Sequence, residues 1–134
     1  LTLRGLRDHV TFTGLISPDD IPGVLAGIDM LAHTSQWEGL PRAVVQALLM
    51  EKPAVCFAVD GAPEVVIPGT TGELAPLGDT DAFATALVRL AHDPAMRRRY
   101  GSEGRRRCLT DFDHNVMVDR LDALYHHLGR THLP

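Results

Sequence analysis

The stretch Ser35-Gln36-Trp37-Glu38-Gly39-Leu40-Pro41 lies between two apolar segments of different periodicity. Met30–His33 before it is short and apolar, which predicts a strand. Pro41 predicts the first turn of an amphipathic helix that continues to Leu49, because its ring presets the helical φ. The stretch is therefore the loop at the C-terminal end of a strand. In open α/β sheets ligands bind at that edge, so this loop is the first candidate for a binding site.

The same alternation of strands and helices continues on both sides of this loop. Apolar and β-branched runs predict further strands at Val10–Gly14, Pro53–Ala58 and Gly69–Leu74. Helical periodicity predicts helices over residues 21–28, 61–66, 79–90, from Pro94 onward, and about 113–128. Strands joined by helices imply crossover connections and a parallel sheet, hence a Rossmann-like, doubly wound α/β fold.

The chain is predicted to be one domain, residues 1–134, with part of that domain absent. About four strands are expected, whereas sheets of this kind usually have roughly five or six. The sequence begins at Leu1 without an initiator methionine. We therefore expect the N-terminal part of the domain to be missing.

Composition excludes several classes of protein. Hydrophobic residues make up 45% and charged residues 22% of the chain, which is ordinary for a globular domain and unlike a disordered one. The net charge of -4 argues against nucleic acid as a partner. No apolar run approaches the roughly 20 residues of a membrane span. Cys56 and Cys108 form neither a disulfide framework nor a metal spacing, so we expect buried thiols, a reducing compartment and a cytoplasmic location.

Six arginines crowd one predicted helix: Arg97, Arg98, Arg99, Arg105, Arg106 and Arg107. Such a run is typical of a solvated helix face. The alternative is a peripheral contact with anionic lipid head groups at the inner face of the cell membrane.

The loop itself carries groups suited to a phosphate. Gly39 lets a ligand approach the backbone closely, and the first amides of the following helix have no partner within that helix. Because Pro41 has no N–H, the candidate donors are the amides of Leu40, Arg42 and Ala43, aided by the positive end of the helix dipole.

Glu38 and Gln46 are candidates for hydroxyl recognition. Helical side chains lean toward the N-terminus, so Gln46 can point back toward a ligand that Glu38 also contacts. A carboxylate accepts two hydrogen bonds and matches a sugar diol, whereas an amide serves a ribose with less strength. The alternative is that Glu38 is a first-turn acid and Gln46 an exposed helix residue, and spacing alone favours it.

A longer pattern resembles a known family. Trp37–Val55 is similar to the Glu-x7-Glu signature of the family 4 retaining glycosyltransferases, usually S-x-x-E-G-[FL]-[PG] followed by E-A-M-A-x-G-x-P-V. Shorter matches to the same family occur, in order, at Val10–Gly14, Asp29-Met30, Gly61–Val65, Thr71–Leu74 and Asp93–Tyr100. The resemblance covers about residues 8–128, which makes it far more specific than a lone glycine loop.

The resemblance implies the C-terminal, donor-binding half of a GT-B fold. The expected substrate is a UDP-sugar or GDP-sugar, and the expected reaction is transfer with retention, without a metal or another cofactor. Glu38 is then the catalytic residue and contacts the donor sugar, while Gly39, Leu40, Pro41 and Arg42 surround the sugar and diphosphate.

Two further positions follow from the resemblance. Gln46 stands where the family has a second glutamate that holds the nucleotide ribose, which is a departure that weakens one hydroxyl contact. Glu64 is expected near the nucleotide pocket, or equally as the cap of its own short helix.

The resemblance also implies a partner. The family stabilises the leaving diphosphate with an arginine and a lysine upstream of the matched region, and it binds the acceptor with an N-terminal domain. Neither has a counterpart in this sequence, so the fragment alone is expected to be inactive. A non-catalytic α/β binding module and a GT-B-type sugar-nucleotide epimerase remain as alternatives.

Other motifs favour structural roles. Asp79-Thr80-Asp81 and Asp111-Phe112-Asp113 both spell the D-x-D of metal-dependent glycosyltransferases, but each stands just before a predicted helix, where aspartate is a preferred cap. No metal site is predicted. His33 ends the strand that feeds the loop, where it either lines the site or packs.

Overall fold

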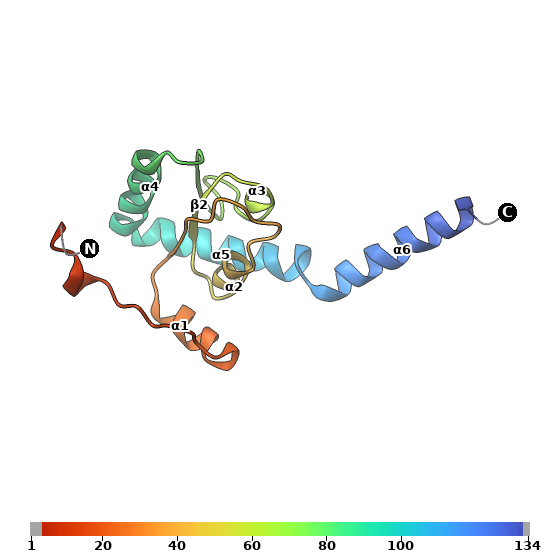
Figure 1. The fold of residues 1–134 in the computed structure, drawn as a ribbon, viewed down its shortest axis with the longest axis horizontal. Coiled ribbons are helices and arrows are strands. Elements are labelled where there is room, and N and C mark those ends of the chain that lie inside the picture. Colours follow the sequence, from red (N-terminus) through yellow and green to blue (C-terminus); the bar gives the residue numbers. More distant parts are fainter. Residues whose placement is uncertain (1–3, 133–134) are drawn as a thin grey trace.

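The computed structural model describes residues 4–132 as an alternation of strands and helices followed by three long helices (Figure 1). In chain order the elements are η2 (Arg7–His9), η3 (Pro18–Asp20), α1 (Ile21–Gly27), β1 (Leu31–His33), α2 (Arg42–Leu49), β2 (Ala54–Phe57), α3 (Ala62–Val65), β3 (Gly72–Ala75), α4 (Thr80–His92), α5 (Pro94–Asp111) and α6 (His114–His132).

The sheet is parallel, as the sequence predicts, with the order β1-β2-β3. His33 of β1 lies opposite Cys56 of β2, and Phe57 of β2 lies opposite Ala75 of β3. Because parallel neighbours require crossovers, α2 connects β1 to β2, and the segment containing α3 connects β2 to β3.

The central strand β2 is buried along its whole length. Ala54 and Cys56 face one core cluster with residues of α2, α3 and α5, whereas Val55 and Phe57 face a second cluster with residues of α4 and α5. The rings of Phe57 and Phe83 are 4.9 Å apart between centroids. Helices therefore cover both faces of the sheet, which explains why this strand reads as a continuous apolar run.

Two glycines let α5 lie directly against the C-terminal part of α2. A Cβ at Gly101 would lie 1.9 Å from the Glu51 carbonyl oxygen, and one at Gly104 would lie 2.5 Å from Leu48 Cδ2. Real Cβ atoms essentially never come closer than 3.0 Å to other heavy atoms. At Gly101 the clash is with backbone, so a larger residue would require one helix to shift, whereas at Gly104 the Leu48 side chain would have to move.

The strand predicted at Val10–Gly14 is absent, and this prediction was wrong. The segment pairs with no strand of the described chain, and Phe12 is 82% exposed. Strands depend on hydrogen bonds to a neighbour, and no neighbour within residues 4–132 takes up this segment. The described sheet therefore has three strands rather than about four.

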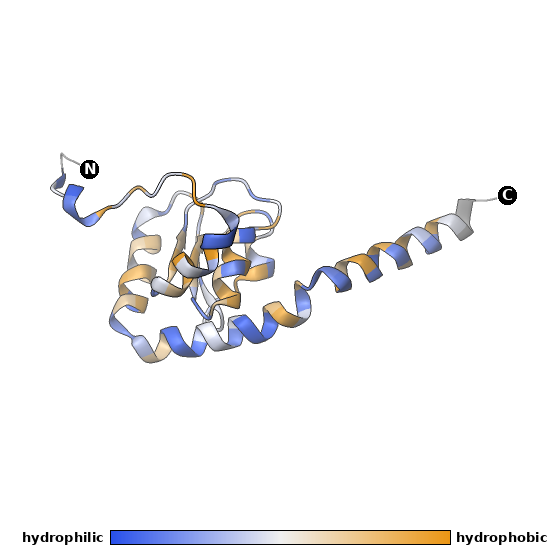
Figure 2. Ribbon diagram, turned by 90° about the horizontal axis from the view of Figure 1, so that it is seen from below, coloured by the Kyte–Doolittle hydropathy of each residue, from blue (hydrophilic) through white to orange (hydrophobic). Residues whose placement is uncertain are grey.

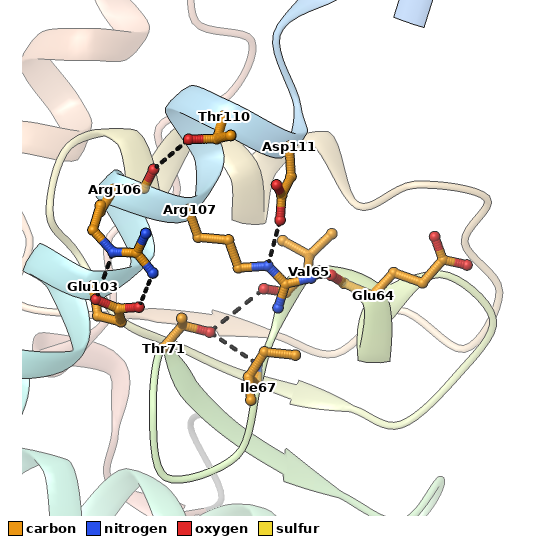
Figure 3. Close-up of polar contacts among 9 residues, drawn as sticks. All are labelled: Glu64, Val65, Ile67, Thr71, Glu103, Arg106, Arg107, Thr110 and Asp111. Carbon is orange, nitrogen blue, oxygen red and sulfur yellow. Dashed lines mark hydrogen bonds and ion pairs between the residues drawn. The ribbon is translucent and has the colours of Figure 1, made fainter. Parts of the chain in front are cut away.

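The arginines of α5 are not simply a solvated face. Three of them donate to carbonyl oxygens in the last turns of other helices: Arg97 to Leu90 in α4, Arg105 to Leu49 in α2 and Arg107 to Glu64 in α3. Helix C-termini leave carbonyls without intrahelical partners and carry a partial negative charge, so each guanidinium stabilises the end of a helix. Figure 3 shows Arg107 between Asp111 and the backbone of Glu64.

Helix α6 extends away from the sheet and its helices (Figure 1). It starts after Asp113, whose carboxylate accepts a hydrogen bond from the Asn115 amide at 2.7 Å. Hydrophobic residues recur along it at helical spacing (Figure 2), and those that are at least two-fifths exposed include Met117, Leu121, Leu124 and Leu128. Within residues 4–132 no helix combines the length and apolar content needed to cross a bilayer.

Candidate functional site

Two loops meet at the C-terminal edge of the sheet. One loop, residues 34–41, leaves β1 at His33, and the other, residues 58–61, leaves β2 at Phe57. Because β1 and β2 are parallel neighbours, both loops emerge on the same side. This is the edge at which the sequence predicts the site.

Two hydrogen bonds join the loops, one from the Glu38 backbone to a side chain and one between backbones. The Glu38 N–H donates to Asp60 Oδ2 at 2.9 Å, and the Gly61 N–H donates to the Glu38 carbonyl oxygen at 3.4 Å. A Cβ at Gly61 would lie 2.0 Å from the Gly39 carbonyl oxygen, so only glycine permits this approach. The position of Glu38 therefore depends on residues 22 and 23 positions further along the chain.

Asp60 is a site residue that sequence reasoning missed. Its φ of 42° lies in the left-handed region, which costs energy for any residue with a Cβ. Such conformations persist where the surroundings hold them, and they cluster at functional sites. The available signal was the dipeptide Asp60-Gly61 directly after an apolar strand, which is typical of a tight turn.

The Glu38 side chain points back to the end of β1. His33 Nε2 and Glu38 Oε1 are 2.9 Å apart, and the two side chains are 16% and 25% exposed. Burial, with a smaller contribution from the nearby Glu38 carboxylate, raises the pKa of the Cys56 thiol to about 12. The carboxylate thus lies near the ends of both β1 and β2.

The start of α2 presents amides without partners. Pro41 is the N-cap, its side chain provides no cap hydrogen bond, and its carbonyl accepts from the amides of Val44 and Val45. In the described part of the chain, the amides of Leu40, Arg42 and Ala43 meet no hydrogen-bond acceptor. These are the three amides that the sequence predicts to be available.

Gly39 borders open space on the outer side of the loop. A Cβ placed on it would have no heavy atom within 4 Å. The neighbouring Pro41, in contrast, is fully buried, so it shapes the turn rather than offering a surface.

A cavity of about 890 Å³ lies beside α2 and brings together four of the predicted residues, Leu40, Arg42, Gln46 and Glu64. Its opposite wall comes from the end of α5 and the first turns of α6. Glu38 does not line this cavity but lies at the strand edge with His33. The roles predicted for all seven residues remain predictions.

Glu64 is not the cap of its helix. Gly61 is the N-cap of α3, without a side-chain hydrogen bond, and Glu64 lies inside the helix. Its carbonyl accepts from Arg107 at 2.7 Å while its carboxylate points away from Arg107 (Figure 3). The cap interpretation was therefore wrong, and the side chain lines the cavity instead.

In both D-x-D sequences the structure gives aspartates local partners. Asp79 accepts from the Ala82 amide at 2.9 Å and caps α4, whereas Asp111 ends α5 and pairs with Arg107. Asp113, the last residue of the second sequence, stands directly before α6 and accepts from the Asn115 amide at 2.7 Å, so the predicted cap before this helix is confirmed at Asp113 rather than at Asp111. Among the residues that the structure describes, no group of three or more histidine, cysteine, aspartate or glutamate side chains could hold a metal ion.

The sequence is similar to known glycosyltransferases. The sequence model of the family described as glycosyl transferases group 1 matches residues 2–107. Alpha-D-kanosaminyltransferase of Streptomyces kanamyceticus is 30% identical over 126 residues, which are 94% of this chain and 33% of that protein. The chain therefore spans about a third of the length of such relatives.

Solved structures share the fold. Sucrose-phosphate synthase from Thermosynechococcus elongatus superposes with a TM-score of 0.88 at 29% identity, over 97% of this chain and 33% of that one. Anabaena Alr3699/HepE, solved in complex with UDP and glucose, gives a TM-score of 0.86 at 28% identity, over 94% of this chain and 34% of that one. These matches confirm the predicted fold class, an α/β domain with a parallel sheet as found in GT-B glycosyltransferases. By its sequence and by its fold, the chain belongs to the glycosyl transferases group 1 family.

Proposed function

We propose that the protein containing this chain transfers a sugar from a UDP-sugar or GDP-sugar to an acceptor with retention of configuration, and that this chain is its donor-binding domain. In this reaction the bond from the anomeric carbon to the diphosphate breaks, and its electron pair leaves with the nucleoside diphosphate. The acceptor hydroxyl bonds to the same face of that carbon, and its proton passes to the leaving nucleoside diphosphate. The resemblance supports a reaction without a metal ion.

One observation carries this proposal: Glu38, on the loop that follows β1, lies at the C-terminal edge of the parallel sheet together with three unpartnered amides, one in that loop and two in the first turn of α2. Unpartnered amides at a helix N-terminus favour a phosphate. We assign the amides of Leu40, Arg42 and Ala43 to the diphosphate, and the open space beside Gly39 to its approach.

The polar side chains complete the donor site in this proposal. Glu38 acts as the catalytic residue in contact with the sugar hydroxyls, and Gln46 accepts from the ribose. Arg42, Gln46 and Glu64 line one cavity next to the same loop, which supports a nucleotide position there. In the complexes of Anabaena Alr3699/HepE the bound molecules include UDP, glucose and UDP-glucose, which favours a nucleotide sugar as the ligand here.

We further propose that an N-terminal acceptor domain covers α6. The exposed apolar side of α6 needs a partner, because large exposed apolar surfaces mark interfaces. The same domain would supply the basic pair that stabilises the leaving diphosphate. The 134 residues alone are then expected to bind the donor weakly and not to turn it over.

The proposed location is the cytoplasm, since both thiols, Cys56 and Cys108, are free and buried. A peripheral contact with anionic lipids at the inner membrane face would fall mainly to Arg98 and Arg99, because Arg97, Arg105 and Arg107 bind carbonyl oxygens. Sedimentation with vesicles of anionic and of neutral lipid tests this contact.

The function is tested by incubating the full-length protein with UDP-hexoses and GDP-hexoses and a panel of acceptors. Mass spectrometry identifies products, and NMR of the anomeric proton shows whether configuration is retained. We expect a glycoside with retained configuration, turnover unchanged by EDTA, and loss of turnover in Glu38→Ala.

The matched control is Glu103→Ala, because Glu103 is also a partly exposed glutamate but pairs with Arg106 on α5, far along the chain from the loop. Release of free nucleotide with an epimerised sugar identifies an epimerase instead. Absence of nucleotide binding, with Glu38→Ala indistinguishable from the wild type, identifies a binding module and refutes the transferase.

A further inference from the structure

His33, at the end of β1, and Glu38, in the loop that follows, form a side-chain pair. His33 Nε2 lies 2.9 Å from Glu38 Oε1, and both side chains are largely buried, with 16% and 25% of their surfaces exposed. An ionised carboxylate only accepts hydrogen bonds, so His33 Nε2 is the donor. Among the described residues, His33 is the only hydrogen-bond partner of the Glu38 carboxylate.

The backbone of His33 is held by the sheet, whereas that of Glu38 is not. His33 is the last residue of β1, and its backbone is held by pairing with the buried β2, opposite Cys56. Glu38, by contrast, lies in a loop without regular hydrogen bonds. A side chain on the sheet therefore holds a side chain on the loop.

The backbone of Glu38 is held independently. Its N–H donates to the Asp60 carboxylate at 2.9 Å, and its carbonyl accepts from Gly61 at 3.4 Å. Asp60 thus positions the main chain, which leaves the orientation of the carboxylate to His33. This division gives the two residues separable roles.

We propose that His33 is a positioning residue that orients the Glu38 carboxylate toward the hydroxyl groups of the donor sugar. The inference rests on the proposed function, in which Glu38 contacts that sugar. His33 uses Oε1, and Oε2 is left for a sugar hydroxyl. A carboxylate held in advance loses less conformational freedom on binding, so the sugar part of the donor binds more tightly.

If His33 positions Glu38, its loss should lower the affinity for the nucleotide sugar and leave the affinity for the nucleotide alone unchanged. The diphosphate and ribose are assigned to the amides at the start of α2 and to Gln46, none of which is hydrogen-bonded to the His33 side chain. His33→Leu should therefore weaken UDP-glucose or GDP-mannose binding roughly tenfold, as expected for one lost hydrogen bond to a charged group. Affinity for UDP or GDP alone should not change.

The experiment measures both affinities by calorimetry on the full-length protein, with whichever base the wild type binds. His33→Gln is the conservative variant, because its amide N–H can donate toward Glu38, and it should restore most of the lost affinity. His33→Leu combined with Glu38→Ala should lose no more than Glu38→Ala alone, because the pair acts as one unit. His92→Leu, an exposed histidine at the end of α4, is the matched control.

The outcomes are distinguishable. Equal losses for nucleotide and nucleotide sugar in both His33 variants would indicate a merely structural role and overturn the inference. If the wild type binds the nucleotide sugar more tightly than the nucleotide and His33→Leu keeps this difference, the inference is overturned and the proposed function is not. A wild type that binds neither ligand overturns the proposed function and the inference with it.

Discussion

Replacement of Gly61 by alanine tests whether contact between the two loops sets the geometry of the site. A Cβ at this position would lie 2.0 Å from the Gly39 carbonyl oxygen, whereas real Cβ atoms essentially never come closer than 3.0 Å. The difference, 3.0 minus 2.0 Å, means that the loops must separate by about 1 Å. The Cβ is fixed by the backbone of its own residue and the oxygen belongs to the backbone of Gly39, so no rotamer change can relieve the clash. The φ of Gly61 is -78°, which alanine adopts freely, so the substitution isolates the clash from backbone strain.

Two effects should follow in Gly61→Ala. Overpacking should lower the free energy of unfolding by about 1–3 kcal/mol. A shift of about 1 Å in the Glu38 loop should reduce kcat/KM on the order of 100-fold. Denaturant titration measures the first effect, and the glycosyl-transfer assay on the full-length protein measures the second.

The control for this substitution is Gly23→Ala. A Cβ at Gly23, inside α1, has no heavy atom within 4 Å, so alanine should raise the free energy of unfolding by about 0.5–1 kcal/mol without affecting turnover. If Gly61→Ala matches the wild type in both stability and kcat/KM, the loops do not constrain each other and the reasoning is wrong.

Three further substitutions and one chemical treatment each have a measurable expected outcome. Gly39→Ala meets no protein atom, so it should keep the unfolding midpoint but weaken donor binding by roughly tenfold or more; unchanged binding would place the donor elsewhere. Gln46→Glu should strengthen nucleotide binding several-fold in calorimetry, because a carboxylate accepts more strongly than an amide. Arg107→Ala should cost about 1 kcal/mol in denaturant titration through the lost bond to α3, and a neutral result would mean that this bond is not formed in solution. Burial raises the pKa of Cys56 to about 12 and that of Cys108 to about 11, so few thiolates exist at pH 8 and mass spectrometry should find neither thiol alkylated until the protein is unfolded.

The order of the elements could be predicted because each carries its own local pattern. Pro53–Ala58 is a continuous apolar run, and the structure has it as the buried central strand β2. Val10–Gly14 has an equally good strand composition but lacks a partner in the described chain. The composition of a segment indicates its propensity to form a strand, but a strand also needs a neighbouring strand within hydrogen-bonding distance.

The candidate site was predictable only in part for the same reason. The loop and the free amides at the start of α2 follow from local sequence. The contact between Glu38 and Asp60 joins residues 22 positions apart, and the contact between His33 and Glu38 has neither helical nor strand spacing. The bonds from the α5 arginines to other helix ends also depend on tertiary packing, which a charge pattern cannot reveal.

Helix α6 has mechanical consequences for the proposed two-domain protein. Its 19 residues give a length of about 28 Å at a rise of about 1.5 Å per residue. It joins α5 only through Phe112 and Asp113, where the helical path is interrupted. A rotation of roughly 10° at this junction would move the far end of α6 by about 5 Å. A partner bound along α6 could therefore be tilted across the donor loop by changing a few backbone dihedrals, while the sheet and its Glu38 loop stay in place.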